Sequence, residues 1–213
     1  MEKLRLSVDL CLSCGSIALS KGRKLISSSC WEGFKRHAEQ VFIQIKNCLK
    51  AAGVDKEELE EVVVTAGPGS FTGVRLSVTV GKAFKSYGIP VLATTTLDAL
   101  SRGYRNLGKD VVPIIPGRKG RFYSRISGEL LDKKAEELAD RISKLQDPLI
   151  VYLDQLPAEL AGFPAVREVV PLAIRLSTIP EGELSELCFY YIRKPDAKKL
   201  SEQEINAGRK EKL

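Results

Sequence analysis

The chain has 213 residues, weighs 23.5 kDa, is 44% hydrophobic and 28% charged, and carries a formal net charge of +6. This length predicts one or two domains that fold without a metal or a disulfide, and the composition excludes a disordered chain. The longest apolar runs are far shorter than the roughly 20 residues of a membrane span. Because the N-terminus also lacks the pattern of a signal peptide, we expect a cytoplasmic protein with no membrane association.

Histidine and cysteine limit the chemistry that the chain can perform. The single histidine, His37, excludes a multi-histidine metal site, and a Ser-His-Asp triad would have to use it. The chain has five cysteines, and an odd number in a chain expected to be cytoplasmic argues against a disulfide framework. Cys11 and Cys14 form a C-x-x-C pair, which predicts small buried or loop cysteines, with redox or metal chemistry as the alternative. We predict no metal site.

The first half of the sequence predicts alternating strands and helices. Residues 4–19 contain two strands around a turn, and residues 25–31 a third. Apolar residues at helical spacing over residues 34–52 predict a long helix that ends before Gly53. A β-branched strand at residues 61–66, a second helix up to Gly88, a strand at residues 89–93 and a helix capped by Thr95 or Thr96 follow. This order predicts an α/β fold.

The second half is shorter and less regular. It predicts strands at residues 111–115, 121–126 and 149–153 and a helix over residues 133–145. Residues 155–186 are weakly patterned, and no internal repeat is visible. We divide the chain into a first lobe at residues 1–107, a reduced second lobe at 108–193 and a charged tail at 194–213 that we expect to be mobile.

The loop at residues 67–73 leaves a strand, holds three glycines and opens a helix. Such a loop can bind an anion through its amides and the helix N-terminus; a tight turn that permits close packing is the alternative. Arg75 places a cation in the first helical turn, where the dipole disfavours it, and Asp9 ends the first strand. The predicted phosphate, nucleotide or interface residues are Gly67, Pro68, Gly69, Ser70, Phe71, Thr72, Gly73, Arg75 and Asp9.

These residues carry a resemblance. The run from Gly67 to Arg75, with Lys82-Ala83 behind it, resembles the signature of the TsaB (YeaZ) family. Residues 36–39 look like that family's His-Ser-Glu element, and residues 6–9 like its first strand. Looser similarities lie at Arg118 and Tyr123 and at residues 191–193.

The resemblance implies a fold of two RNase H-like lobes, as in actin, Hsp70 and sugar kinases, with the second lobe reduced. It also implies a non-catalytic platform for making threonylcarbamoyladenosine in tRNA, without metal-binding histidines. The implied partners are a TsaD-like catalytic subunit, a TsaE-like ATPase and, through the complex, tRNA; ATP or ADP would bind only at the partner interface. In isolation such proteins form homodimers. Pairing would use the two long helices, and the residues expected there are His37, Val41, Ile45, Val74, Val78 and Gly81.

Two departures from the family pattern favour a platform over an enzyme. Leu10 and Cys11 stand after Asp9 where the family has hydroxyl residues, and Gly117 replaces a carboxylate before Arg118. Two other functions remain open: an ATP-dependent phosphotransferase using Asp9 and the glycine loop, and a peptidase built on His37.

Overall fold

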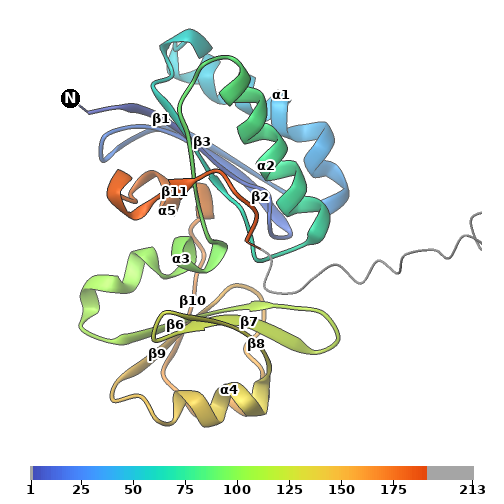
Figure 1. The fold of residues 1–213 in the computed structure, drawn as a ribbon, viewed down its shortest axis with the longest axis vertical. Helices are drawn as coiled ribbons and strands as arrows, with labels where there is room; N and C mark the ends of the chain where they lie inside the picture. The colour runs from blue at the N-terminus through green and yellow to red at the C-terminus, as the bar shows by residue number, and fades with distance from the viewer. Residues whose placement is uncertain (1, 191–213) are drawn as a thin grey trace, which may run out of the picture.

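The computed structural model describes residues 2–190 and places two mixed β-sheets in two lobes, one above the other (Figure 1). The predicted α/β fold is therefore confirmed. In this described part, no helix is both long and apolar enough to cross a membrane. The family-like residues 191–193 and the predicted tail at 194–213 lie outside the described residues.

The first sheet has six strands in the order β11-β5-β4-β1-β2-β3. Its N-terminal meander is confirmed, since β1 pairs antiparallel with β2 and β2 with β3, while β1, β4 and β5 run parallel. The strands are β1 (Leu4–Asp9), β2 (Cys14–Lys21), β3 (Lys24–Glu32), β4 (Glu61–Thr65), β5 (Val91–Thr94) and β11 (Ser185–Glu186).

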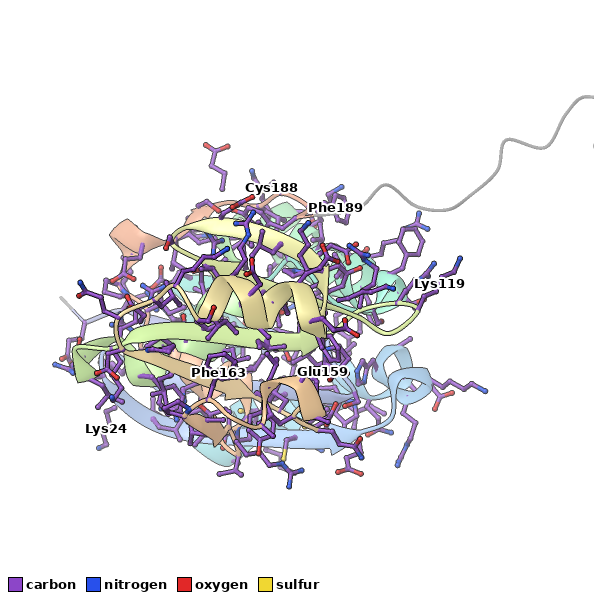
Figure 2. All side chains as sticks on the ribbon, turned by 90° about the horizontal axis from the view of Figure 1, so that it is seen from below. Lys24, Lys119, Glu159, Phe163, Cys188 and Phe189 are labelled. Carbon is purple, nitrogen blue, oxygen red and sulfur yellow. The ribbon has the colours of Figure 1, made fainter. Side chains whose placement is uncertain are left out.

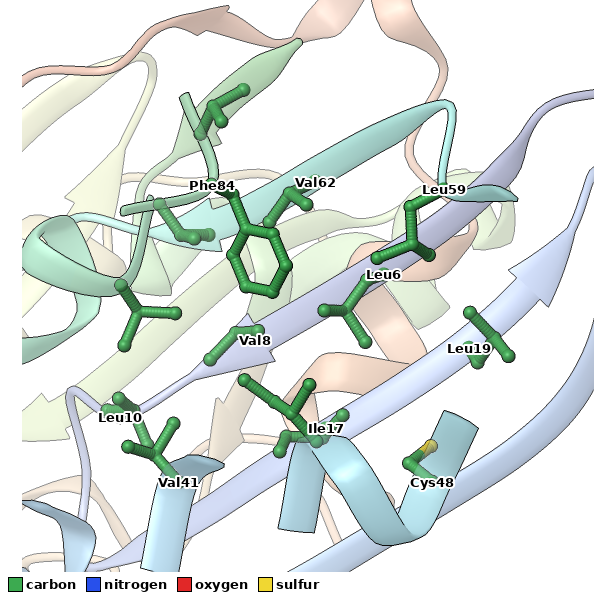
Figure 3. Packing of buried hydrophobic residues seen from close by; sticks show 14 of the residues in the cluster. Leu6, Val8, Leu10, Ile17, Leu19, Val41, Cys48, Leu59, Val62 and Phe84 are labelled. Atoms are coloured by element: carbon green, nitrogen blue, oxygen red, sulfur yellow. The ribbon is translucent and has the colours of Figure 1, made fainter. Parts of the chain in front are cut away.

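Two long helices cover one face of this sheet. They are α1 (His37–Ala52), preceded by the 3-10 turn η1 (Phe34–Arg36), and α2 (Phe71–Ser86). In Figure 3, Val41 and Cys48 of α1 and Phe84 of α2 point toward Ile17 and Val8 of the strands. The helical spacing of apolar residues in the sequence thus reflects packing on the protein's own sheet.

The second sheet repeats the topology of the first. Its order is β10-β9-β6-β7-β8, with antiparallel β6–β7 and β7–β8 pairs and parallel β6–β9 and β9–β10 pairs. The strands are β6 (Asp110–Pro116), β7 (Arg121–Ile126), β8 (Glu129–Lys134), β9 (Pro148–Tyr152) and β10 (Ala165–Arg167). Helix α4 (Ala135–Ile142) corresponds to α1 and lies across this sheet in Figure 2. Where the first lobe has α2, only the short turn η4 (Ala158–Leu160) is present.

The C-terminal part of the described chain returns to the first lobe. Helix α5 (Leu172–Ser177) packs against β1 and β2, on the face opposite α1 and α2, and β11 adds to the edge of β5. Residues 172–190 therefore extend the first lobe, although they fall within the predicted second lobe at 108–193. A core shared by the two lobes includes Leu100, Ile115 and Leu176.

Several short elements refine the sequence prediction. Helix α3 (Thr96–Ser101) begins as expected, because the Thr95 hydroxyl accepts from the Asp98 amide at 3.0 Å. The short turns are η2 (Lys56–Glu58), η3 (Arg102–Leu107) and η5 (Glu181–Glu183). The helix predicted over residues 133–145 is wrong at its start, since residues up to Lys134 belong to β8.

Candidate functional site

Asp9 lies buried at the end of β1, with 1% of its surface exposed. Its Oδ1 accepts hydrogen bonds from the Thr65 hydroxyl and, at 3.3 Å, from the Cys11 amide. Its Oδ2 has no hydrogen-bond partner among the described residues. Burial raises the pKa of the Asp9 carboxyl to about 6, because removing the charged form from water outweighs the two hydrogen bonds.

The glycine loop packs directly against the loop that follows β1. The Ser70 amide donates to the Cys11 carbonyl at 2.8 Å, and the Ser70 hydroxyl caps α2 by accepting from the Gly73 amide at 2.9 Å. A Cβ at Gly69 would overlap the Cys11 carbonyl oxygen, and a Cβ at Gly73 would overlap that of Leu10. These two glycines therefore permit contact between two stretches of backbone.

Gly67 allows a second close contact between two stretches of backbone, here with Tyr190. It has φ of +103°, and a Cβ there would lie 2.6 Å from the Tyr190 carbonyl oxygen. The Tyr190 amide donates to the Ala66 carbonyl at 2.8 Å. We call residues 185–190 the C-terminal strap; Figure 2 shows its Cys188 and Phe189 at the outside of the molecule. Gly67 and Pro68 are buried beneath the strap's end.

Among the predicted loop residues, Phe71, Thr72 and Arg75 are exposed at the start of α2. The Arg75 guanidinium lies 5.1 Å from the centroid of the Phe71 ring, which is a cation–π distance. The structure thus brings Asp9 and the glycine loop together through Cys11, while Phe71, Thr72 and Arg75 can meet an external molecule.

The two cysteines of the C-x-x-C pair lie in different environments. The buried Cys11 thiol donates to the Thr65 carbonyl at 3.6 Å, and burial raises its pKa to about 12. Cys14 is half-buried; burial, helped by the nearby Cys30 thiol, raises its pKa to about 11. Both thiols therefore stay protonated near neutral pH. Within residues 2–190, no group of three or more His, Cys, Asp or Glu side chains could hold a metal ion.

His37 is buried, with 1% of its surface exposed, and both ring nitrogens are engaged. Nδ1 accepts from the Trp31 indole at 3.1 Å, and Nε2 lies 2.8 Å from the Leu12 carbonyl oxygen. Since an indole N–H only donates and a carbonyl only accepts, the imidazole is neutral with its proton on Nε2. His37 therefore joins β3, α1 and the loop after β1, and neither nitrogen is available for a peptidase mechanism.

The six residues expected at a partner surface are largely buried. His37, together with Val41, Ile45, Val74, Val78 and Gly81, is buried within the chain, with no relative exposure above 5% where a value is given. Val41, Ile45 and Val78 pack in the hydrophobic core of the first lobe, and Ile45 also lines a groove on the outer side of α1 and α2. Pairing through these residues stays a prediction.

The outer side of α1 and α2 carries an apolar groove instead. Phe42 of α1 is 53% exposed and Tyr87, at the end of α2, is 73% exposed. Between them lies a hollow of about 1240 Å³. Sequence periodicity assigned both aromatics to the buried stripe, so it missed them as surface residues. The groove is lined by Phe42, Ile45, Lys46, Leu49, Lys50, Gly53, Val54, Asp55, Lys56, Glu57, Leu59, Glu60, Ala83, Phe84, Tyr87, Gly88, Ile89 and Pro90.

Comparison with solved structures agrees with this fold. A Pseudomonas aeruginosa protein described as similar to the peptidase YeaZ superposes with a TM-score of 0.70 at 22% identity, covering 90% of this chain and all of that one. The ethanolamine utilization protein EutJ of Carboxydothermus hydrogenoformans gives a TM-score of 0.51 at 9% identity over 84% of this chain and 90% of EutJ. Together with the repeated sheet topology, these neighbours show that the chain has the two-lobed α/β fold of the YeaZ structure.

Comparison with known sequences identifies the family. A family model described as TsaD, tRNA N6-adenosine threonylcarbamoyltransferase, matches residues 32–167. The tRNA threonylcarbamoyladenosine biosynthesis protein TsaB of Bacillus subtilis is 32% identical over 42% of this chain and 40% of its own length. TsaB of Buchnera aphidicola from Acyrthosiphon pisum is 28% identical over 58% and 57%. The aligned part spans about half the length of these relatives. The chain belongs to the TsaD family, as one of its TsaB (YeaZ) members.

Proposed function

We propose that this chain is a non-catalytic platform subunit that pairs with a TsaD-like catalytic subunit to add threonylcarbamoyl to adenosine in tRNA. The names of its curated relatives support the pathway. The main structural support for pairing with a catalytic subunit is the apolar groove between Phe42 and Tyr87. Large exposed aromatics around a hollow are the usual anchors of a protein–protein interface.

The geometry around Asp9 supports a platform over an enzyme. Gly69 and Gly73 use their lack of a side chain to pack on the carbonyls of Cys11 and Leu10. The amides of Ser70 and Gly73 already donate within the chain. The loop is thus built to hold β1 and α2 together. In this proposal a TsaE-like ATPase joins the complex, ATP or ADP binds at the partner interface, and tRNA is reached through the complex.

A second candidate is an ATP-dependent phosphotransferase. The unpartnered Oδ2 of the buried Asp9 favours it, because such an oxygen can bind a metal-bound water or a protonated phosphate. Calorimetry of the isolated chain with Mg-ATP distinguishes the two candidates. Micromolar binding that is lost in Asp9→Asn supports the phosphotransferase, and the absence of heat supports the platform.

The platform is tested by capture from the native host. A tagged chain should retain a TsaD-like protein, and depletion of the chain should lower threonylcarbamoyladenosine in tRNA. The double variant Phe42→Ala/Tyr87→Ala should lose the partner. Leu25→Ala, which alters an exposed apolar residue on β3, is the matched control and should keep it. If the wild-type chain retains no TsaD-like protein and the nucleoside level is unchanged, the proposal is wrong.

A further inference from the structure

A polar pocket lies at the opposite end of the first sheet from Asp9. Asp9 ends β1, whereas this pocket lies where β1 and β4 begin, beside the end of α5 and the turn between β2 and β3. Its volume of about 440 Å³ is in the range of small-molecule sites. The charged side chains in its lining are Lys3, Arg5, Arg23, Arg102, Glu61 and Glu181. The pocket is therefore separate from the glycine loop and carries charges of both signs.

Arg5 supplies a fixed hydrogen-bond donor to this pocket. Only 8% of its surface is exposed. Its Nε donates to Glu61 Oε1 at 2.8 Å and its Nη1 to the Ile179 carbonyl at 2.5 Å, so the guanidinium is held from two directions. Its other amine nitrogen, Nη2, donates to no described atom and is not sealed from solvent. Because a guanidinium matches the geometry of a carboxylate, Arg5 can bind an anionic group through Nη2.

Arg23 adds a second cation that is available to a ligand. It is exposed in the turn between β2 and β3, and no carboxylate of residues 2–190 lies within 4.0 Å of it. The other two cations of the lining are paired. Arg102 Nη1 lies 3.3 Å from the Glu183 carboxylate, and Lys3 Nζ lies 2.7 Å from that of Glu181. Arg23 can therefore donate to the same anionic group as the buried guanidinium.

Lys3 shows which group the two carboxylates of the pocket bind. Its Nζ lies 2.7 Å from Glu181 Oε2 and 4.0 Å from Glu61 Oε2. Glu61 is only 2% exposed, yet its Oε2 accepts no hydrogen bond from a described group. A buried carboxylate oxygen without a partner requires a donor. Since the Lys3 side chain is 40% exposed, its ammonium can move aside, and another ammonium can take the position between the two carboxylates.

We infer that this pocket binds a free α-amino acid as its zwitterion. The carboxylate accepts hydrogen bonds from Arg5 Nη2 and Arg23, and the ammonium replaces that of Lys3 between Glu61 and Glu181. A phosphate would lie against the two carboxylates of the lining, which repel it, and a simple amine would leave both guanidinium groups without a partner. The inference does not rest on the proposed function, because none of these residues belongs to the apolar groove or the glycine loop.

Titration of the full chain with glycine, followed by the NMR shifts of its backbone amides, tests the inference. Glycine should shift the amides of residues 3–5, 22–23 and 177–181, which line or flank the pocket, and should saturate at roughly millimolar concentration. Acetate, methylamine and inorganic phosphate each carry only one part of this chemistry. Each of the three should therefore bind at least about tenfold more weakly than glycine.

Two substitutions should change the affinity for glycine in opposite directions. Arg23→Ala removes a donor to the carboxylate and should weaken binding on the order of fivefold. Lys3→Ala removes the competing ammonium and should strengthen binding by a similar factor. Both side chains are exposed, so neither change should prevent folding. Lys24→Ala is the matched control, because this neighbouring cation is exposed and does not line the pocket; it should bind glycine as the wild-type chain does.

Four results would overturn the inference. Glycine may shift none of these amides at saturating concentration, or phosphate or acetate may bind as tightly as glycine does. The Arg23→Ala and Lys24→Ala proteins may bind glycine equally well, or Lys3→Ala may bind it more weakly than the wild-type chain. Circular dichroism checks that each variant is folded, so that a lost signal reports on the pocket.

Discussion

Gly81 in the middle of α2 lies directly beneath Leu187 of the C-terminal strap. A Cβ at position 81 would be 3.2 Å from both methyl carbons of Leu187 and 3.2 Å from Cγ1 of Val91. The sequence suggested that this glycine allows another protein to approach the helix. The structure shows instead that it makes room for the chain's own strap, which explains a glycine at a position that disfavours it.

Replacement of Gly81 should therefore affect folding. Gly81→Leu should lower the free energy of unfolding by about 2 kcal/mol, because the added side chain overpacks the contact with Leu187. Gly81→Ala should change it by less than about 1 kcal/mol, since better helix propensity offsets the tight contact. Urea unfolding measures both. A Gly81→Leu protein as stable as wild type would show that the strap does not pack there.

His37 should be important for stability. His37→Ala removes the hydrogen bonds to Trp31 and to the Leu12 carbonyl and leaves a small cavity, so we expect a loss of about 2–4 kcal/mol. Trp31 is the only tryptophan, so its fluorescence reports the change at the site. The nearby exposed Glu39→Ala is the control and should stay within about 0.5 kcal/mol of wild type. Equal unfolding midpoints for the two variants would contradict this role.

The glycine loop gives a matched pair of alanine substitutions. Gly73→Ala places a Cβ against the Leu10 carbonyl oxygen, whereas a Cβ at Gly162 would meet no atom within 4 Å. Gly73→Ala should cost at least about 2 kcal/mol, and Gly162→Ala should be close to neutral. Thermal and chemical unfolding of the two proteins decide the matter. A stable Gly73→Ala protein would mean that the loop has room for a ligand.

Asp9 should make stability depend on pH. Its carboxyl has a folded pKa of about 6, above the ordinary 3.8, so the folded state binds the proton more tightly than the unfolded chain. The stabilisation by protonation is full below about pH 4 and is lost as the pH rises through 6, a change of roughly 3 kcal/mol. Asp9→Asn should remove this dependence and be more stable than wild type at pH 8. Parallel pH profiles for the two proteins would contradict it.

The sequence predicted the first lobe well because local signals and tertiary structure agree there. The three-strand meander, α1 and the Thr95 cap follow from alternation, helical period and capping chemistry. The site was harder to predict. Val41 and Ile45 belong to an apolar stripe along α1. The periodicity of the sequence is the same whether the protein's own sheet or a partner protein covers that stripe. Asp9 and Ser70 meet through Cys11, although the sequence separates them by about sixty residues.

In the second lobe, the sequence predicted β6, β7, β9 and most of α4 but missed the remaining elements for other reasons. The charged end of β8, with Lys133 and Lys134, continues without a break into α4, so the helical pattern concealed the strand. Helix α5 and β11 are too short for a periodic signal, and their positions depend on contacts with β1, β2 and β5. The repeated sheet topology is likewise invisible in the sequence, because two copies of a fold can share strand order without sharing residues.

The return of the chain to the first lobe also sets an order for folding during synthesis. One guanidinium nitrogen of Arg5, in the first strand, donates to the carbonyl of Ile179, at 2.5 Å, and the sheet face around it is covered by α5. A ribosome must therefore translate nearly the whole described chain before the first strand reaches its final surroundings. Strand β1 is translated long before α5, which covers one face of its sheet. A nascent chain that stops within the second lobe therefore leaves that face of the first sheet open to water.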